Sequence, residues 1–405
     1  MPTKLELAKD LARHLRAGHP WVYKRAVEAA PRLEAGAVVD VVEKGRFVAR
    51  GYFDPLSPIA VRVLTRDPAE AVGPLFWRRR IAQAVATRRA LVLAADTDCC
   101  RLIHGEGDGL PGVIADLYGK FAVLKLYSAG LTPFRADIVE ALRGEVALDG
   151  VFGRDEPAAG RRHADDEEAE DAESEPGRGR ALWGAEPPEH IAVIENGARL
   201  LVDVRGGQKT GMFLDQRENR FALRRYARGR RALNCFSYSG GFSVAAALGG
   251  AREVTSVDRD ADALALAQKN FELNGLAARH ETAASDVLDF LAARKAEGAR
   301  YDLVVLDPPA FAKTQKAVPA ALDGYASLHR AALALLPPGG ILATASCSAR
   351  VSAEEFSGAI KEAAAKSHAG LQLLEERRQP PDHPVSIAFP EGRYLKFMVF
   401  RRVEW

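Results

Sequence analysis

The sequence is poor in cysteine and contains no long apolar run. Its 405 residues include only four cysteines, Cys99, Cys100, Cys235 and Cys347, and no Cys-x-x-Cys pair. This spacing predicts free thiols and gives no indication of a disulfide framework, a zinc site or another metal centre. No apolar run approaches the roughly 18 to 20 residues that a membrane span requires, so we expect a soluble protein without a membrane partner.

The first twenty residues also lack the apolar core of a secretory signal, because polar residues recur every few positions in MPTKLELAKDLARHLRAGHP. We therefore expect a cytoplasmic protein. A composition of 47% hydrophobic and 27% charged residues is typical of globular proteins, and the length allows two or three domains. The oligomeric state is left open, with a homodimer as one option.

Positive charge is concentrated near the N-terminus, although the whole chain has a formal net charge of only +2. Residues 1–90 hold about 17 Lys and Arg against about 9 Asp and Glu, including the run Arg78, Arg79 and Arg80. This excess favours binding to a polyanion such as RNA, and the alternative is a solvated basic face.

The first half of the sequence indicates two small domains. Residues 37–65 are β-branched and are broken by glycine and proline, which predicts short strands joined by turns. A helical stretch over 74–95 is followed by glycine-rich turns that alternate with strand-like runs. We therefore assign residues 1–75 to a small β-rich domain and residues 76–190 to a central α+β domain.

An acidic segment lies within this central domain. Asp155 to Glu175 hold about ten carboxylates, few apolar residues and no periodicity. This composition predicts a flexible acidic insertion over 155–180 in a surface loop.

From residue 191 onward, strand-like runs alternate with helical segments. The runs are RALNCFS, EVTSVD, ETAASD, YDLVVLD, GILATASC and a final YLKFMVFRRV. This alternation predicts an α/β fold with a doubly wound sheet over 191–405. Such sheets bind ligands outside the carboxyl ends of their strands, so the residues directly after each run are the candidates for a site.

The ends of the first three runs carry groups suited to a nucleotide cofactor. Gly240 in NCFSYSGGFS permits a tight turn before a helix, and Asp258 can accept hydrogen bonds from a ribose diol. Asp286, after the third run, suits an adenine amino group. Dehydrogenases share the first two features, and each residue has an alternative structural role as a turn glycine or a helix-capping aspartate.

The fourth run distinguishes a methyltransferase from a dehydrogenase. It ends in LDPPAFAK, and an acidic residue followed by Pro-Pro and an aromatic residue resembles motif IV of S-adenosylmethionine-dependent nucleic-acid methyltransferases. Asp307 is expected to meet a base edge, and Pro308 and Phe311 are expected to supply apolar surface against a flipped-out base. The alternative is a buried Pro-Pro turn without function.

Together, several motifs resemble the family of large-subunit ribosomal RNA cytosine-5 methyltransferases that carry an N-terminal PUA domain: GQKTGMFLDQRENR, NCFSYSGGFS, VDRD, LDPPAFAK and SCS. RAGHPWVYK, GRFVARGYFDPLSPIAVRVL and HGEGDGLPGVIADLYG are similar to the PUA and central domains of that family. The resemblance implies a C-terminal Rossmann-like class I methyltransferase sheet, S-adenosylmethionine as cofactor and large-subunit ribosomal RNA as partner. The acidic insertion departs from the compact family pattern.

The resemblance also assigns roles to residues. Cys347 matches the family's nucleophile, whose thiolate adds to carbon 6 of cytosine and activates carbon 5, while Asp307 hydrogen-bonds to the base. The segment FLDQRENR is expected to lie over the cofactor pocket, with Phe213 as its apolar cover. The cofactor-binding residues implied are Phe213, Gln216, Arg217, Asn234, Cys235, Phe236, Ser237, Gly240, Asp258, Asp286 and Asp307.

Some of these roles have competing interpretations. Cys347 has the alternative of a small buried hydrophobe at a strand end, and its rival Cys235 is expected to face the cofactor. Arg217 and Arg220 have the alternative of surface charges at the start of a helix. The group that removes the carbon 5 proton is unidentified, because Ala310 stands where many related enzymes carry a second cysteine.

Two other functions also fit the sequence. Related Asp-Pro-Pro-aromatic domains methylate purine nitrogens by direct transfer, which needs no thiol. The third interpretation is a catalytically inactive RNA-binding assembly factor.

Overall fold

The computed structural model describes residues 2–8, 10–28, 32–154 and 179–404. The chain divides into two compact units. The first comprises Met1–Val193, Val202–Leu214 and Pro381–Gly392, and the second comprises Ile194–Leu201, Asp215–Pro380 and Arg393–Trp405. The chain therefore leaves each unit and returns to it. Among the described residues, no helix combines the length and the apolar character that crossing a bilayer would need.

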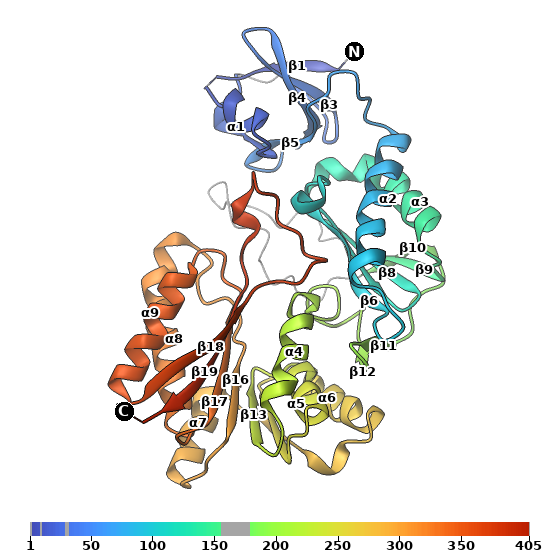
Figure 1. Cartoon of the computed structure of the whole chain (residues 1–405). Helices are drawn as coiled ribbons and strands as arrows, with labels where there is room; N and C mark the ends of the chain where they lie inside the picture. The colour runs from blue at the N-terminus through green and yellow to red at the C-terminus, as the bar shows by residue number, and fades with distance from the viewer. Residues whose placement is uncertain (1, 9, 29–31, 155–178, 405) are drawn as a thin grey trace. The chain divides into compact units, whose positions relative to one another are not determined.

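The N-terminal part of the first unit is a five-stranded sheet with its own apolar core, shown in blue in Figure 1. The strand order is β1-β3-β4-β5-β2, in which β1 and β3 are parallel and the other neighbours are antiparallel. The predicted strands over 37–65 are confirmed as β3, β4 and β5. The elements are β1 Thr3–Glu6, α1 Ala12–Arg16, β2 Trp21–Tyr23, β3 Val38–Glu43, β4 Arg46–Phe53 and β5 Ile59–Thr65.

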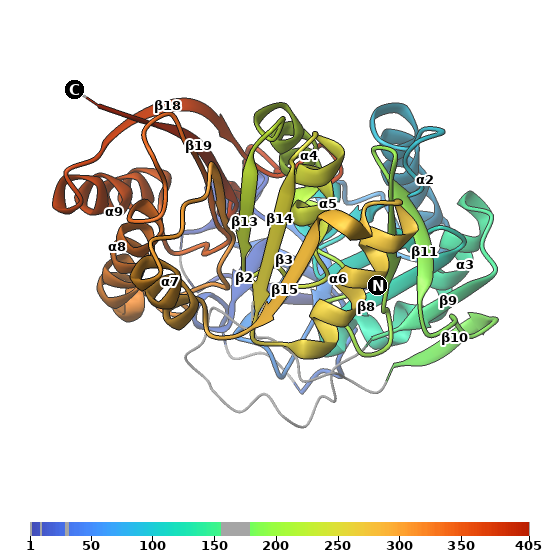
Figure 2. The ribbon, with the colours of Figure 1, turned by 90° about the horizontal axis from the view of Figure 1, so that it is seen from below.

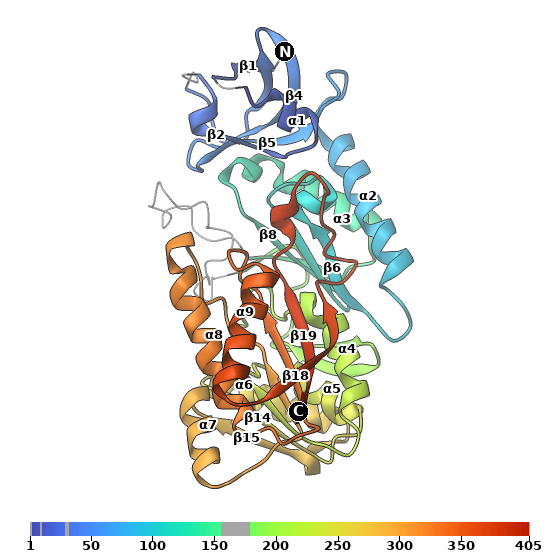
Figure 3. The ribbon, with the colours of Figure 1, turned by 60° about the vertical axis from the view of Figure 1, so that its left-hand side comes forward.

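A second five-stranded sheet follows, with the order β10-β9-β8-β7-β6 and a separate core. Helices α2 and α3 lie beside each other and pack against this sheet (Figure 3). The first of them begins at Pro74, because the fixed φ of proline suits the first helical turn. The elements are α2 Pro74–Leu91, β6 Cys99–His104, β7 Val113–Tyr118, β8 Phe121–Leu126, α3 Arg135–Glu145, β9 Gly150–Gly153 and β10 Arg180–Gly184.

The predicted acidic insertion falls, up to residue 178, outside the described residues. The insertion is predicted to extend to residue 180, but Arg180 is already the first residue of β10 and pairs with Gly153.

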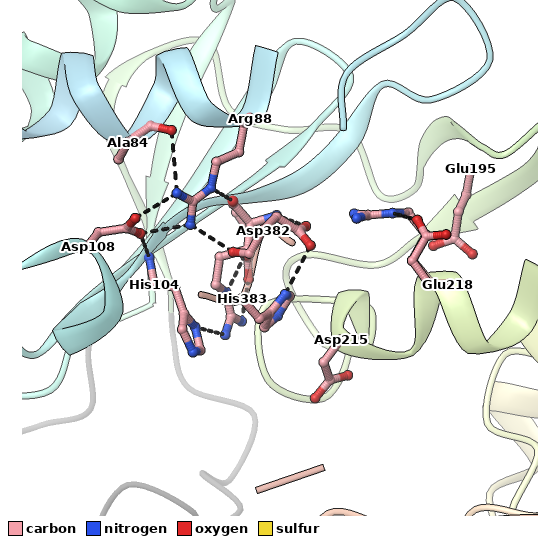
Figure 4. A network of polar contacts seen from close by, with 12 residues as sticks. Ala84, Arg88, His104, Asp108, Glu195, Asp215, Glu218, Asp382 and His383 are labelled. Carbon is pink, nitrogen blue, oxygen red and sulfur yellow. Dashed lines mark hydrogen bonds and ion pairs between the residues drawn. The ribbon is translucent and has the colours of Figure 1, made fainter. Parts of the chain in front are cut away.

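Residues Pro381–Gly392 belong to the first unit although the sequence places them within the C-terminal domain. Figure 4 shows the polar contacts that hold them. Arg88 is fully buried, forms a bidentate ion pair with Asp108 at 2.7 Å, and donates to the Asp382 carbonyl at 2.7 Å. The Asp382 carboxylate in turn accepts from the backbone of Arg101 at 2.9 Å. The expected domain boundary at 191 therefore does not describe these twelve residues.

The second unit contains a seven-stranded sheet with the order β15-β14-β13-β16-β17-β19-β18. The first five are parallel, and β19 runs antiparallel to both of its neighbours, β17 and β18. Helices cover both faces, with α5 and α6 on one and α7, α8 and α9 on the other (Figure 2). This confirms the predicted doubly wound α/β sheet. The strands are β13 Arg231–Cys235, β14 Glu253–Asp258, β15 His280–Ala284, β16 Leu303–Leu306, β17 Ile341–Ser346, β18 Gly370–Arg377 and β19 Lys396–Val403.

The helices of this unit are α4 Arg217–Leu223, α5 Gly241–Leu248, α6 Ala261–Leu273, α7 Val287–Ala296, α8 Val318–Leu333 and α9 Ala353–Lys366. A short hairpin, β11 Ile191–Glu195 and β12 Ala198–Val202, precedes the sheet in sequence.

Strand β18 is not predicted from the sequence. It is an edge strand whose bulge between Leu373 and Glu375 interrupts the alternation of its side chains, so Leu373 and Leu374 are both exposed. Its residues, GLQLLEER, form neither an alternating pattern nor a continuous apolar run, which are the two sequence signals of a strand.

Candidate active site

The turn after β13 has a strained backbone. Phe236 has a φ of 60° and Tyr238 a φ of 47°, in the left-handed region that residues with a Cβ rarely adopt. Gly240 follows with a φ of 78° and precedes α5, as the predicted tight turn requires. Strain of this kind persists where the surroundings impose it and is concentrated at functional sites. The first half of the candidate site is therefore a preformed turn.

Asp258, the last residue of β14, holds this turn in place. Its Oδ2 accepts a hydrogen bond from the Tyr238 backbone N–H at 2.8 Å, and its Oδ1 accepts one from Asp260 at 3.0 Å. Strands β13 and β14 are parallel neighbours, so their carboxyl ends meet at one edge of the sheet. The structure thus brings Gly240 and Asp258 together, while the contact of Asp258 with a ribose stays a prediction.

Asp286 follows β15 and caps helix α7. Its carboxylate accepts from the backbone N–H groups of Leu288 at 2.9 Å and Asp289 at 3.2 Å, and it also pairs with Arg259. Desolvation raises the pKa of Asp286, but these hydrogen bonds and the Arg259 guanidinium lower it by more, so the pKa lies below its ordinary value. The helix-capping alternative is thus the role that the structure shows, and the adenine contact stays a prediction.

Three buried polar atoms near this turn have no hydrogen-bond partner among the described residues: Asn219 Oδ1, Asn234 Oδ1 and Ser237 Oγ. The other side of the Asn234 amide donates to Ser243 at 2.9 Å. Buried polar groups are nearly always paired, so unpaired ones call for a ligand or water. S-adenosylmethionine brings an ammonium group, ribose hydroxyls and an adenine amino group, and these donors fit such acceptors.

Helix α4 carries the residues predicted to lie over the cofactor. Gln216, directly before it, donates from Nε2 to Asp307 Oδ1 at 3.0 Å, and its Oε1 accepts from Asn219 at 2.7 Å. Gln216 therefore contacts the carboxylate that is expected to meet the base. Its own contact with the cofactor stays a prediction.

The two arginines of α4 are not surface charges. Arg217 is 1% exposed and pairs with Glu218 at 3.1 Å. Arg220 is also buried and forms a bidentate pair with Glu195 at 2.7 and 2.6 Å. The surface-charge alternative is therefore wrong for both. Phe213 belongs to the first unit, and its place as apolar cover stays a prediction.

The second half of the candidate site lies at the ends of β16 and β17. These strands are parallel neighbours with Leu306 opposite Thr344, so Asp307 and Cys347 emerge from the same edge of the sheet. Both side chains are partly exposed. Both also lie near Tyr325, whose pKa is raised by burial and further by Cys347 and Asp307. The structure thus brings the two predicted catalytic residues together.

The expected apolar surface beside Asp307 differs from the prediction in one residue. Pro308 is buried and its neighbour Pro309 is exposed. Phe311 is partly exposed and its ring lies 4.7 Å from that of Tyr325. Pro309 and Phe311 therefore supply the accessible apolar surface.

Buried polar contacts that the sequence did not reveal brace the end of β17. The Tyr325 hydroxyl lies 2.9 Å from Ser346 Oγ, and His329 Nε2 lies 2.8 Å from Thr344 Oγ1. Burial lowers the pKa of His329 to about 4, so its imidazole is neutral. Ser348 Oγ donates to the Ala312 carbonyl at 3.0 Å and joins the two loops that carry Cys347 and Asp307. The Tyr-x-x-x-His spacing on α8 was the one available signal.

The two cysteines of the second unit have different environments. Cys235 is the last residue of β13, is fully buried, and belongs to the core beneath α7, α8 and α9. Burial also raises the pKa of its thiol. The Cys235 side chain therefore points into this core, because side chains alternate along a strand and Asn234 takes the opposite face. A contact of Cys235 with the cofactor stays a prediction. Cys347 lies one residue beyond its strand and is partly exposed.

Two families match this chain. The S-adenosylmethionine-dependent methyltransferase family matches residues 174–401, and the PUA-like domain matches residues 5–66. The chain is 40% identical over 403 residues to ribosomal RNA large subunit methyltransferase I of Cronobacter sakazakii, with 98% of each protein covered. The corresponding protein of Klebsiella pneumoniae is also 40% identical, with 97% of this chain and 96% of that protein covered.

Two solved structures of candidate methyltransferases are also similar over nearly the whole chain. One, from Streptococcus mutans, is 25% identical with a TM-score of 0.81, and the other, in complex with SAH, is 26% identical with a TM-score of 0.83. Each comparison covers 98% of this chain and 100% of the other. The N-terminal sheet is thus PUA-like and the C-terminal sheet is that of an S-adenosylmethionine-dependent methyltransferase.

Proposed function

Because this chain belongs to the family of S-adenosylmethionine-dependent ribosomal RNA large subunit methyltransferases, we propose that it methylates carbon 5 of a cytosine in that RNA. The observation that carries the proposal is the placement of Asp307 and Cys347 at the ends of neighbouring parallel strands. The contrast with the buried thiol of Cys235 supports Cys347 as the nucleophile.

The two residues divide the work. Carbon 5 of cytosine is a poor nucleophile, so the Cys347 thiolate first adds to carbon 6, and the electron pair of the 5,6 double bond moves toward carbon 5. Asp307 hydrogen-bonds to ring nitrogen 3 or the amino group and stabilises the charge that develops on the ring. S-adenosylmethionine, when bound, supplies the methyl group. A base then removes the carbon 5 proton, the carbon–sulfur bond breaks, and Cys347 is released.

The turn after β13 serves cofactor binding in this proposal. Asp258 accepts from the ribose, and the unpaired acceptors on Asn219 and Asn234 together with Ser237 Oγ take the remaining polar groups. The PUA-like domain, whose end of the chain is rich in arginine and lysine, supplies affinity for the RNA. The reaction then takes place in the cytoplasm.

The experiment compares Cys347→Ser with Cys235→Ala. Unmethylated large-subunit ribosomal RNA is incubated with each protein and S-adenosylmethionine, and 5-methylcytosine is mapped by sequencing. We expect Cys347→Ser to lose methylation by at least about 10³-fold, since a hydroxyl is far less nucleophilic than a thiolate. Cys235→Ala should retain it, because that thiol only fills the core.

RNA carrying 5-fluorocytosine provides a second readout. Fluorine cannot leave as a proton, so the unaltered protein and Cys235→Ala should form a denaturant-stable complex with it, and Cys347→Ser should not. If Cys347→Ser formed the complex and Cys235→Ala did not, the nucleophile would be Cys235 and not Cys347. Full methylation of a purine nitrogen by Cys347→Ser would establish the purine alternative, and absence of turnover with intact binding would establish the assembly factor.

A further inference from the structure

A buried lysine lies directly behind the loop that carries Cys347. Lys396, the first residue of β19, stands opposite Ser346 in the antiparallel register and is 2% exposed. Lysine is almost never fully buried unless its ammonium group finds partners. Here Nζ donates to the carbonyl oxygens of Ser348 at 2.5 Å, Val351 at 2.8 Å and Tyr394 at 2.8 Å.

These contacts fix the turn that follows Cys347. Ser348 and Val351 are the two ends of that turn, and the Val351 N–H donates to the Ser348 carbonyl at 3.3 Å. Lys396 therefore ties both ends to β19. Ser348 is the residue next to Cys347, so Lys396 restrains the loop that carries the thiol.

The ammonium group has an electrostatic effect in addition. It hydrogen-bonds to the carbonyl of the residue next to Cys347, in a buried setting where charges interact more strongly than in water. A positive charge near a thiol favours its thiolate form, and here the charge is held one residue away from Cys347 by the Ser348 carbonyl. Other charged or titratable groups near Cys347 include Asp307 after β16 and Tyr325 on α8, and Arg350 follows within the same turn of the chain.

We propose that Lys396 is a positioning residue for Cys347, which holds the turn behind the thiol and favours the thiolate that adds to cytosine. This inference rests on the proposed function, since the thiolate is needed only if Cys347 is the nucleophile. Lys396 need not touch the RNA, the cofactor or the reacting atoms.

The test is the pH dependence of alkylation of Cys347 by iodoacetamide in the free protein, read by mass spectrometry of its peptide. The other three cysteines are buried, and Cys347→Ser gives the background. In Lys396→Met we expect the rate profile to move to higher pH by about one unit, so that alkylation at pH 7 slows about 10-fold. Lys366→Met, which removes an exposed lysine at the end of α9, should leave the profile unchanged.

Two further measurements keep the test decisive if Lys396→Met does not fold. Lys396→Gln retains a donor but removes the charge, and it should show the same shift. In the unaltered protein, Cys347 should react at lower pH than the same thiol in the urea-unfolded chain. The inference is overturned if a folded variant keeps the native profile, or if the native and unfolded thiols react alike.

Methylation kinetics separate this inference from the proposed function. Folded Lys396 variants should lose about 10-fold or more in kcat while the affinities for RNA and S-adenosylmethionine stay unchanged. If Cys347→Ser methylates normally, the proposed function has failed, whereas the alkylation profiles still decide whether Lys396 acts on the thiol.

Discussion

The turn after β13 and the ends of β16 and β17 lie at one edge of the same sheet, yet they are built by different means. The turn depends on backbone geometry, with three residues at positive φ and a carboxylate that accepts backbone N–H groups. The ends of β16 and β17 depend on polar contacts between side chains: buried His329 contacts buried Thr344 of β17, and buried Gln216 donates to partly exposed Asp307.

This difference follows from what each half has to hold. A cofactor with many polar groups can be bound by backbone and by a few fixed acceptors. A thiol and a carboxylate that act on one base must keep a fixed direction, which requires buried hydrogen bonds around them. Changes in the first half should therefore affect cofactor affinity, and changes in the second should affect turnover or the stability of the support.

The largest effect in this comparison is expected at Asp258. Asp258→Ala removes the acceptor of the Tyr238 N–H and the predicted ribose contact, so S-adenosylmethionine affinity should fall by about 1.5 to 3 kcal/mol. Titration calorimetry measures this change. Asp262→Ala, an exposed carboxylate in the first turn of α6, is the matched control and should bind normally. Unchanged S-adenosylmethionine affinity in Asp258→Ala would contradict the proposal that the turn after β13 binds the cofactor.

His329, which contacts Thr344 of β17, should make the stability of the protein depend on pH. The pKa of buried His329 is about 4, below its ordinary value of 6.5, so between these values the unfolded state binds the extra proton. The contribution of neutral His329 to the free energy of unfolding is therefore fully present above pH 6.5 and is lost as the pH falls toward 4. The contribution lost between pH 7 and pH 5 is about 2 kcal/mol.

Denaturant unfolding at the two pH values measures this loss. His329→Gln cannot take up a proton, so its difference between pH 7 and pH 5 should be smaller by that amount, although its stability at pH 7 is lower. His14→Gln, at an exposed histidine, should keep the full difference. An identical difference in all three proteins would contradict the support role.

The smallest effect is expected at Gln216. This residue was predicted to bind the cofactor, but it contacts Asp307, so its variant tests to which half it belongs. Gln216→Leu removes the donor to Asp307, and kcat should fall about 5- to 10-fold, equivalent to about 1 kcal/mol. S-adenosylmethionine affinity should not change. Gln268→Leu, on the exposed side of α6, is the control. The reverse result, weaker cofactor binding with normal kcat, would return Gln216 to the cofactor half.

The sequence predicted the residues of the site but not the residues that support them, for a physical reason. Gly240, Asp258 and Asp307 follow strand-like runs directly, and a parallel sheet brings such positions to one edge whatever the loops between them do. The supports could not be predicted in this way. Lys396 and His329 come from segments far along the chain, and the first reads as part of an ordinary apolar strand.

The basic excess near the N-terminus was also only partly informative. Arg50 pairs with Asp40 at 2.7 Å and Arg88 pairs with Asp108 inside the first unit, so these arginines are committed to internal ion pairs. A count of charges treats every arginine as available to RNA. Only the three-dimensional partners tell which of them serve the fold instead.

The ion pair of Arg88 also bears on how the protein is made. Its guanidinium needs the carbonyl of Asp382, which lies 294 residues further along the chain. Domains generally begin to fold as they emerge from the ribosome, N-terminal part first. The first unit therefore cannot make this hydrogen bond of its buried guanidinium until Asp382 has been synthesised. A nascent chain stalled before residue 381 thus holds an incomplete first unit.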